Sequence, residues 1–122
     1  MSKVILTVDD SRTMRDMLNL ALVDAGFRVT QAVDGMHGLE VLRANEMPDV
    51  IVTDINMPKL DGFGFIEGVR QDARHRATPI LVLTTESDSA KKNRAREAGA
   101  TGWIVKPFNP EKLVEAVRRV AA

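Results

Sequence analysis

Cysteine and tyrosine are absent from this sequence, and aromatic residues make up only 4% of it. Without cysteine, the chain can form no disulfide, no thiolate metal site and no cysteine nucleophile. The absence also fits a reducing compartment, so we expect a cytoplasmic protein. Any chemistry must therefore come from oxygen and nitrogen groups.

A net charge is missing as well, since 17 basic residues balance 17 acidic ones. The sequence has no dense run of Lys and Arg with interleaved aromatic residues, so nucleic-acid binding is not expected. The first apolar run, residues 4–6, is too short for a signal peptide or a transmembrane helix. We therefore expect neither nucleic acid nor a membrane as a partner.

The remaining composition is that of a globular protein. Hydrophobic residues make up 44% and charged residues 28% of the 122 residues, which is enough to bury a core. This length is usual for a single domain. We expect one domain over residues 1–122, without a separate output domain, that acts as a monomer.

Five short runs predict β-strands. Residues 4–8, 50–53 and 80–84 are almost continuously apolar or β-branched, which is typical of strands buried on both faces of a parallel sheet. Residues 28–32 alternate between polar and apolar side chains, and residues 102–105 form only a short apolar run. Both strands are therefore expected at the sheet edges.

Apolar residues with helical spacing follow each predicted strand. Gly26 and Gly99 suit left-handed helix ends, and Asp61 and Asn109 suit helix N-caps. The repeated order of strand and helix predicts an α/β fold, a (βα)5 doubly wound parallel sheet of flavodoxin-like type with strand order 2-1-3-4-5.

Polar residues stand where the predicted strands end. They are Asp9 and Asp10 after the first strand, Asp54 after the third, Thr84 at the end of the fourth and Lys106 after the fifth. In doubly wound sheets, ligands bind beyond the carboxyl ends of the strands. Each residue alone is equally typical of a turn, a strand or a surface, so it is their joint placement that predicts a site.

The three carboxylates repel each other, and a pair about 4 Å apart costs about 4 kcal/mol at an effective dielectric constant near 20. One lysine cannot compensate them all, so we expect a divalent cation. Hard oxygen ligands favour Mg²⁺, which also binds phosphate oxygens. We expect Asp54 to attack phosphorus while Lys106 neutralises the phosphoryl oxygens and Thr84 donates to the transferred group.

The chain resembles the receiver domains of two-component response regulators, and most of all the stand-alone chemotaxis regulators of the CheY type. The resemblance runs from Lys3 to the C-terminus and is carried by four motifs, which are Val8-Asp9-Asp10-Ser11, Asp54-Ile55-Asn56-Met57-Pro58 with Asp61-Gly62, Leu83-Thr84, and Trp103-Ile104-Val105-Lys106-Pro107-Phe108.

This resemblance implies that Asp54 takes a phosphoryl group from a histidine kinase. It also implies that Asp10, Asp54 and the backbone carbonyl of Asn56 hold Mg²⁺, that Asp9 helps through water, and that Lys106 binds phosphate. The protein would then be a phosphoacceptor rather than an enzyme with a separate substrate.

The resemblance further implies a switch in which Thr84 moves toward the phosphoryl group and the aromatic residue at position 103 rotates inward. The face formed by the fourth helix, fifth strand and fifth helix then changes its affinity for a partner. Position 103 is Trp here, where chemotaxis regulators usually carry a smaller hydroxylated aromatic residue. Its bulk alters or hinders the inward rotation, and simple core packing is an equal alternative.

Asn56 and Glu86 stand two residues beyond Asp54 and Thr84. By resemblance, they flank the path of an attacking water, and we expect self-dephosphorylation within seconds to minutes. His37 and His75 are expected to be exposed and without a role.

Several alternatives stay open. The output partner is a flagellar motor switch protein, another kinase or a relay protein, or the chain is a phosphate sink. The basic residues Lys91, Lys92, Arg94 and Arg96 either bind an acidic partner or are only solvated. A small phosphatase with an aspartyl nucleophile is disfavoured by length, and a nucleotide-binding fold is disfavoured by the acidic turn after the first strand.

Overall fold

The computed structural model describes residues 2–121, which form five strands and five α-helices in strict alternation. The elements are β1 (Val4–Val8), α1 (Arg12–Asp24), β2 (Arg28–Ala32), α2 (Gly35–Ala44), β3 (Val50–Thr53), α3 (Gly62–Gln71), the 3₁₀ turn η1 (Ala73–His75), β4 (Ile80–Thr84), α4 (Ser89–Ala98), β5 (Gly102–Val105) and α5 (Pro110–Ala121). The predicted α/β alternation is confirmed.

The strands form one parallel sheet in the order β2-β1-β3-β4-β5. All residues of β1, β3 and β4 are buried, as expected for apolar strands covered on both faces. β2 and β5 lie at the edges and are more exposed. The predicted strand order and edge strands are therefore correct.

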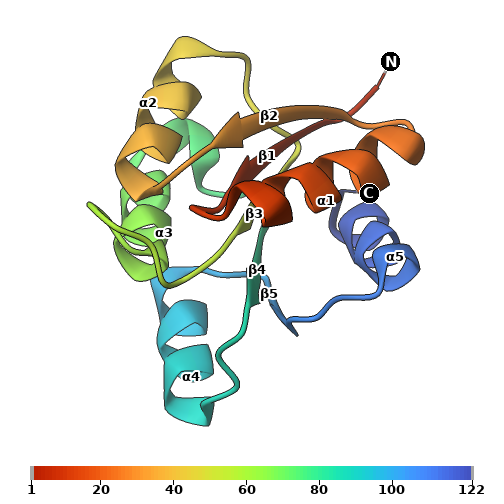
Figure 1. Cartoon of the computed structure of the whole chain (residues 1–122). Helices are drawn as coiled ribbons and strands as arrows, with labels where there is room; N and C mark the ends of the chain where they lie inside the picture. Colours follow the sequence, from red (N-terminus) through yellow and green to blue (C-terminus); the bar gives the residue numbers. More distant parts are fainter. Residues whose placement is uncertain (1, 122) are drawn as a thin grey trace.

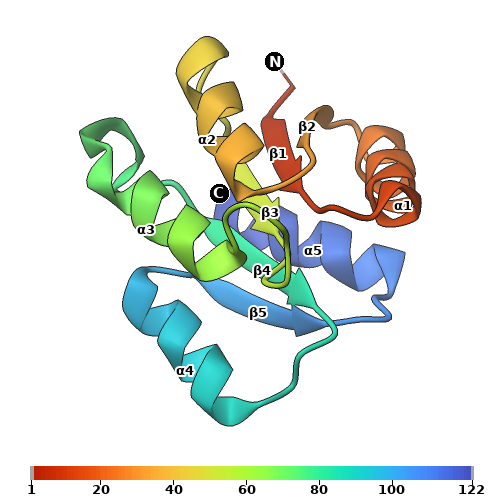
Figure 2. The same ribbon diagram turned by 60° about the vertical axis from the view of Figure 1, so that its left-hand side comes forward.

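Helices cover both faces of the sheet (Figures 1 and 2). α1 and α5 lie on one face and α2, α3 and α4 on the other. Each face has its own core, with Leu18, Leu22, Leu113 and Val117 on the first, and Leu42, Phe65, Ile66 and Val69 among the residues on the second. No helix within residues 2–121 is long and apolar enough to cross a membrane.

Helix ends follow the predicted signals. The Asp61 side chain accepts from the Gly64 N–H at the start of α3, and Asn109 accepts from the N–H groups of Glu111 and Lys112 at the start of α5. Gly26, after α1, has φ +96°, and Gly99, after α4, has φ +117°. Both glycines adopt the left-handed conformation that ends a helix.

The prediction that His75 is exposed is wrong. Its side chain is 0% exposed, and its Nδ1 lies 3.2 Å from Thr78 Oγ1. The 3₁₀ turn before β4 directs the ring beneath α2 and α3, where it lines a small cavity of about 60 Å³ together with Leu39, Leu42 and Val69. Burial disfavours the charged ring and lowers the pKa of His75.

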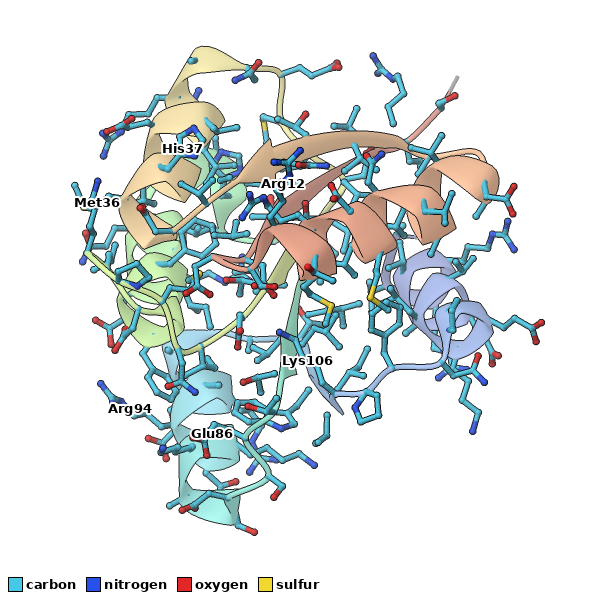
Figure 3. All side chains as sticks on the ribbon, in the orientation of Figure 1. Arg12, Met36, His37, Glu86, Arg94 and Lys106 are labelled. Carbon is cyan, nitrogen blue, oxygen red and sulfur yellow. The ribbon has the colours of Figure 1, made fainter. Side chains whose placement is uncertain are left out.

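His37 is half-buried rather than exposed, because its Nδ1 accepts the Val33 N–H at 3.0 Å in the turn before α2. In Figure 3 it lies on α2, well away from Lys106. It has a local structural role and takes no part in the predicted site.

Candidate functional site

Three carboxylates meet beyond the carboxyl ends of β1 and β3. Asp9, Asp10 and Asp54 each offer an oxygen atom, and these atoms lie within 4.8 Å of one another. Asp9 is 2% exposed and Asp54 9%, whereas Asp10 is exposed at the rim. The predicted acidic cluster is therefore present, with two members buried and one open to solvent.

Backbone pairing places the two buried carboxylates. The Asp9 N–H donates to the Ala32 carbonyl at 3.1 Å, and the Asp54 N–H donates to the Val8 carbonyl at 3.0 Å. Because β1 and β3 are neighbours in a parallel sheet, both residues leave the sheet at the same edge. The site is thus a consequence of strand register.

Lys106 reaches the two buried carboxylates from the segment after β5. Its Nζ lies 2.9 Å from Asp9 Oδ2 and 3.1 Å from Asp54 Oδ2. Its backbone N–H donates to the Thr84 carbonyl at 2.8 Å, which ties it to the end of β4. In Figure 3, Lys106 lies near the middle of the molecule.

The charges of this group do not cancel. Three carboxylates and one ammonium leave two negative charges at the rim. Burial raises the pKa of Asp9, although the Ser11 N–H and the Lys106 ammonium oppose the rise. Burial also pulls down the pKa of Lys106, but Asp9 and Asp54 outweigh it and the net pKa is raised, so the lysine is held as a cation.

Such a donor set fits a hard divalent cation. The available groups are carboxylate oxygens, with one carboxylate exposed to solvent and no cysteine in the chain. Mg²⁺ binds through one or two carboxylates and keeps several waters, and it brings the two positive charges that the rim lacks. Asn56, whose backbone carbonyl is the predicted additional ligand, follows Asp54 by two residues in the same loop.

The loop after β3 is packed tightly around Asp54. The Ile55 N–H donates to Asp54 Oδ1 at 2.6 Å, and the Gly62 N–H donates to the Ile55 carbonyl at 2.8 Å. A Cβ at position 62 would collide with the Asp54 carbonyl and approach Ile55 Cα to 2.7 Å. Glycine at the start of α3 therefore allows this helix to approach the backbone of Asp54 and Ile55 closely.

Arg15 was not anticipated at the site. Its Nη1 donates to the Asp9 carbonyl at 2.7 Å and fixes the turn between β1 and α1. The sequence signal is weak, because an arginine one helical turn after the Ser11 N-cap is ordinary on a solvated helix.

A second group of polar residues surrounds Glu86. The backbone N–H of Glu86 donates to Thr84 Oγ1 at 3.3 Å, and the side-chain Oε1 of Glu86 lies 3.5 Å from Asn56 Nδ2. Trp103 Nε1 donates to the Glu86 carbonyl at 3.1 Å. The structure thus brings together the four residues predicted for the switch and the water path, while their roles stay predictions.

Trp103 both packs and hydrogen-bonds. It is half-buried against the core cluster that includes Val82 and Ala95, and its indole N–H reaches the loop between β4 and α4. Lys91 also contacts Glu86 Oε1, at 3.0 Å, a contact that its place among the basic residues predicted to bind an acidic partner or to be solvated does not reveal. In Figure 3, Glu86 lies beside α4.

Comparison with known proteins agrees with this geometry. Residues 5–118 match the family model described as the response regulator receiver domain. The chemotaxis protein CheY1 of Helicobacter pylori is 39% identical over 117 residues, which cover 95% of this chain and 94% of that protein. Some relatives are longer proteins, and the chain spans 44% of the length of one and 15% of another.

Solved structures show the same fold. The chemotaxis protein CheY4 of Vibrio cholerae has a TM-score of 0.93 at 44% identity and covers 98% of this chain and 99% of its own. The receiver domain of the sensor histidine kinase PA1611 from Pseudomonas aeruginosa has a TM-score of 0.88 at 26% identity. The match covers 99% of this chain and 98% of that one. That structure holds a magnesium ion in its active-site cleft.

Proposed function

Because the chain belongs to the response regulator receiver family, we propose that it is a phosphorylation-activated response regulator of a two-component system, in which Asp54 accepts a phosphoryl group from a histidine kinase. The observation that carries the proposal is the cluster of Asp9, Asp10 and Asp54 with Lys106 across its two buried members. Such a site favours a divalent cation and a transferable anionic group.

The proposed transfer is a displacement at phosphorus. A carboxylate oxygen of Asp54 forms the new P–O bond while the P–N bond of the kinase phosphohistidine breaks, and the leaving imidazole takes a proton from solvent. In this proposal Lys106 contacts the phosphoryl oxygens, which its Nζ position 3.1 Å from Asp54 Oδ2 supports. The 2.6 Å bond from the Ile55 N–H to Oδ1 fixes the orientation of the carboxylate.

Mg²⁺ is the proposed cofactor, held by Asp10, Asp54 and the Asn56 carbonyl, with Asp9 acting through water. When bound, it neutralises charge on the phosphoryl oxygens. The relative from Pseudomonas aeruginosa supports this choice, because its structure has a magnesium ion in its active-site cleft. The net double negative charge of the rim supports it independently.

The proposed output is a change in protein binding by the face of α4, β5 and α5, coupled to Asp54 through Thr84 and Trp103. The similarity to CheY1 and CheY4 favours chemotaxis and a motor switch protein as partner. A phosphate sink or relay intermediate for a histidine kinase is the alternative. Under either proposal the protein acts as a phosphoacceptor that assists its own phosphoryl transfer and loss.

Incubation with acetyl phosphate and Mg²⁺, followed by intact-mass measurement, tests the proposal. Wild type should gain the mass of one phosphoryl group, Asp54→Asn should gain none, and the exposed Asp24→Asn should behave as wild type. A gain that survives Asp54→Asn would place the phosphorylation elsewhere. Steady turnover of an added phosphate ester would instead favour a phosphatase.

A further inference from the structure

Glu86 is held at its backbone and at its side chain. Its N–H and carbonyl bond to Thr84 and Trp103. Its Oε1 faces two donors, Asn56 Nδ2 at 3.5 Å and Lys91 Nζ at 3.0 Å. The backbone contacts fix where the residue sits, and the side-chain contacts fix where its carboxylate points.

The two side-chain contacts differ in strength. A separation of 3.5 Å is at the long limit of a hydrogen bond, whereas the lysine contact at 3.0 Å is short and carries opposite charges. The Glu86 side chain is 28% exposed and that of Lys91 43%. Lys91, in the first turn of α4, is therefore the principal anchor of the Glu86 carboxylate.

The anchored carboxylate lies next to the loop that carries the phosphoacceptor. Asn56 follows Asp54 by two residues, and Glu86 follows Thr84 by two. A water that hydrolyses the acyl phosphate must approach phosphorus opposite the Asp54 oxygen, and a fixed carboxylate beside this approach can accept a hydrogen bond from it. A freely rotating carboxylate would do so less often.

We propose that Lys91 is a positioning residue that holds the Glu86 carboxylate beside Asn56 and so shortens the lifetime of the phosphoryl group on Asp54. This inference rests on the function proposed above. In the hydrolysis, a water oxygen forms a bond to phosphorus, the P–O bond to Asp54 breaks, and inorganic phosphate leaves with the carboxylate regenerated. Lys91 touches none of these atoms and acts only through Glu86.

The size of the effect is limited by exposure. A partly exposed ion pair in water is weak, so removal of the Lys91 side chain should slow hydrolysis of the phosphoryl group by only about two- to five-fold. Lys91→Arg retains a cation that can reach the same oxygen and should restore most of the rate. In a Glu86→Ala background, Lys91→Ala should have no further effect, because the group through which it acts is gone.

The experiment follows loss of the phosphoryl group by intact mass after loading with acetyl phosphate and Mg²⁺ and removal of the donor. Wild type, Lys91→Ala, Lys91→Arg, Glu86→Ala and the double variant are compared. Lys3→Ala removes an equal charge from an exposed residue next to the opposite end of β1 and should decay as wild type. The Asn56 side-chain amide resonances of unphosphorylated protein should shift in Lys91→Ala and stay near the wild-type position in Lys91→Arg.

The outcomes separate the two proposals. If wild type gains no phosphoryl group, the proposed function fails. If wild type is loaded but Lys91→Ala decays at the wild-type rate or faster, the role of Lys91 fails while the function stands. The role of Lys91 also fails if Lys91→Arg loses the phosphoryl group as slowly as Lys91→Ala. It fails as well if Lys91→Ala slows the loss by the same factor in the Glu86→Ala background as in wild type.

Discussion

Replacement of Lys106 by methionine should destabilise the protein in the absence of divalent cations. Its ammonium contacts Asp9 at 2.9 Å and Asp54 at 3.1 Å, and the three side chains are 10%, 2% and 11% exposed. Removing one member of a buried ion pair leaves an uncompensated charge, which typically costs about 3–5 kcal/mol. Because this site is at the rim and water can relax around it, we expect a loss of about 2–4 kcal/mol at neutral pH.

The loss should depend on pH with a definite sign. Without Lys106, the pKa of Asp9 rises further above its ordinary value, because burial then acts without its principal opposing cation. A carboxyl group whose folded pKa is raised destabilises the fold when it is ionised, so the penalty is full above the folded pKa and disappears below the unfolded one. The difference between variant and wild type should therefore shrink as the pH falls toward about 4.

Urea denaturation in EDTA at a series of pH values measures the loss of stability and its pH dependence. The same measurements in Mg²⁺ give the effect of the cation. Mg²⁺ should stabilise the variant at least as much as wild type, because the cation no longer competes with an ammonium for the carboxylates. Lys92→Met, at an exposed position on α4, is the matched control and should keep the wild-type urea midpoint. An unchanged midpoint in EDTA for Lys106→Met would refute the electrostatic reasoning.

Three further predictions concern stability. Gly62→Ala should lose about 1–3 kcal/mol in urea denaturation, because its Cβ meets the Asp54 carbonyl. Arg70→Ala should lose about 2–3 kcal/mol, because the partly buried guanidinium donates to the Gly99 carbonyl at 2.7 Å and to the His75 carbonyl at 2.6 Å. An unchanged urea midpoint would contradict this prediction. The lowered pKa of His75 means that the unfolded chain takes up a proton first, so wild-type stability should fall as the pH drops below about 6.5. His75→Gln should show a shallower dependence in denaturation series from pH 7.5 to 5.5, and an equal slope would contradict the burial argument.

The strands could be predicted because their signals are local. Ile80–Thr84 is apolar along its length and is followed by polar residues, so its limits are visible in sequence and agree with the structure. The glycines at positions 26 and 99 are equally local signals, since their backbone conformation suits few other residues. The strand order then follows from the right-handed crossover connections between parallel strands, a rule that applies to any chain of alternating strands and helices.

Features that depend on side-chain direction were not predictable. Asp9 and Asp10 are identical neighbours in sequence, yet one is buried against Lys106 and the other faces solvent. The sequence around His75 is that of an ordinary loop, and the packing of α2 and α3 above the 3₁₀ turn buries this residue. Contacts such as Lys91 with Glu86 depend on how α4 is set against the β4–α4 loop, which no periodicity encodes.

Under the proposed function, the geometry around Thr84 suits both phosphoryl transfer and signalling. Thr84 Oγ1 accepts the Glu86 N–H at 3.3 Å, so its hydroxyl proton is available to donate to a phosphoryl oxygen without breaking that bond. The proposed phosphorylation would replace one negative charge on Asp54 with about two, which would attract such a donor more strongly. Because Glu86 is bonded to both Thr84 and Trp103, we expect any shift of the threonine toward the phosphoryl group to move the indole on β5. Trp103 is the only tryptophan in the chain, so its fluorescence should change on loading with acetyl phosphate and Mg²⁺ in wild type and stay constant in Thr84→Ala. An equal change in both proteins would show that the indole senses the charge directly rather than through this chain of hydrogen bonds.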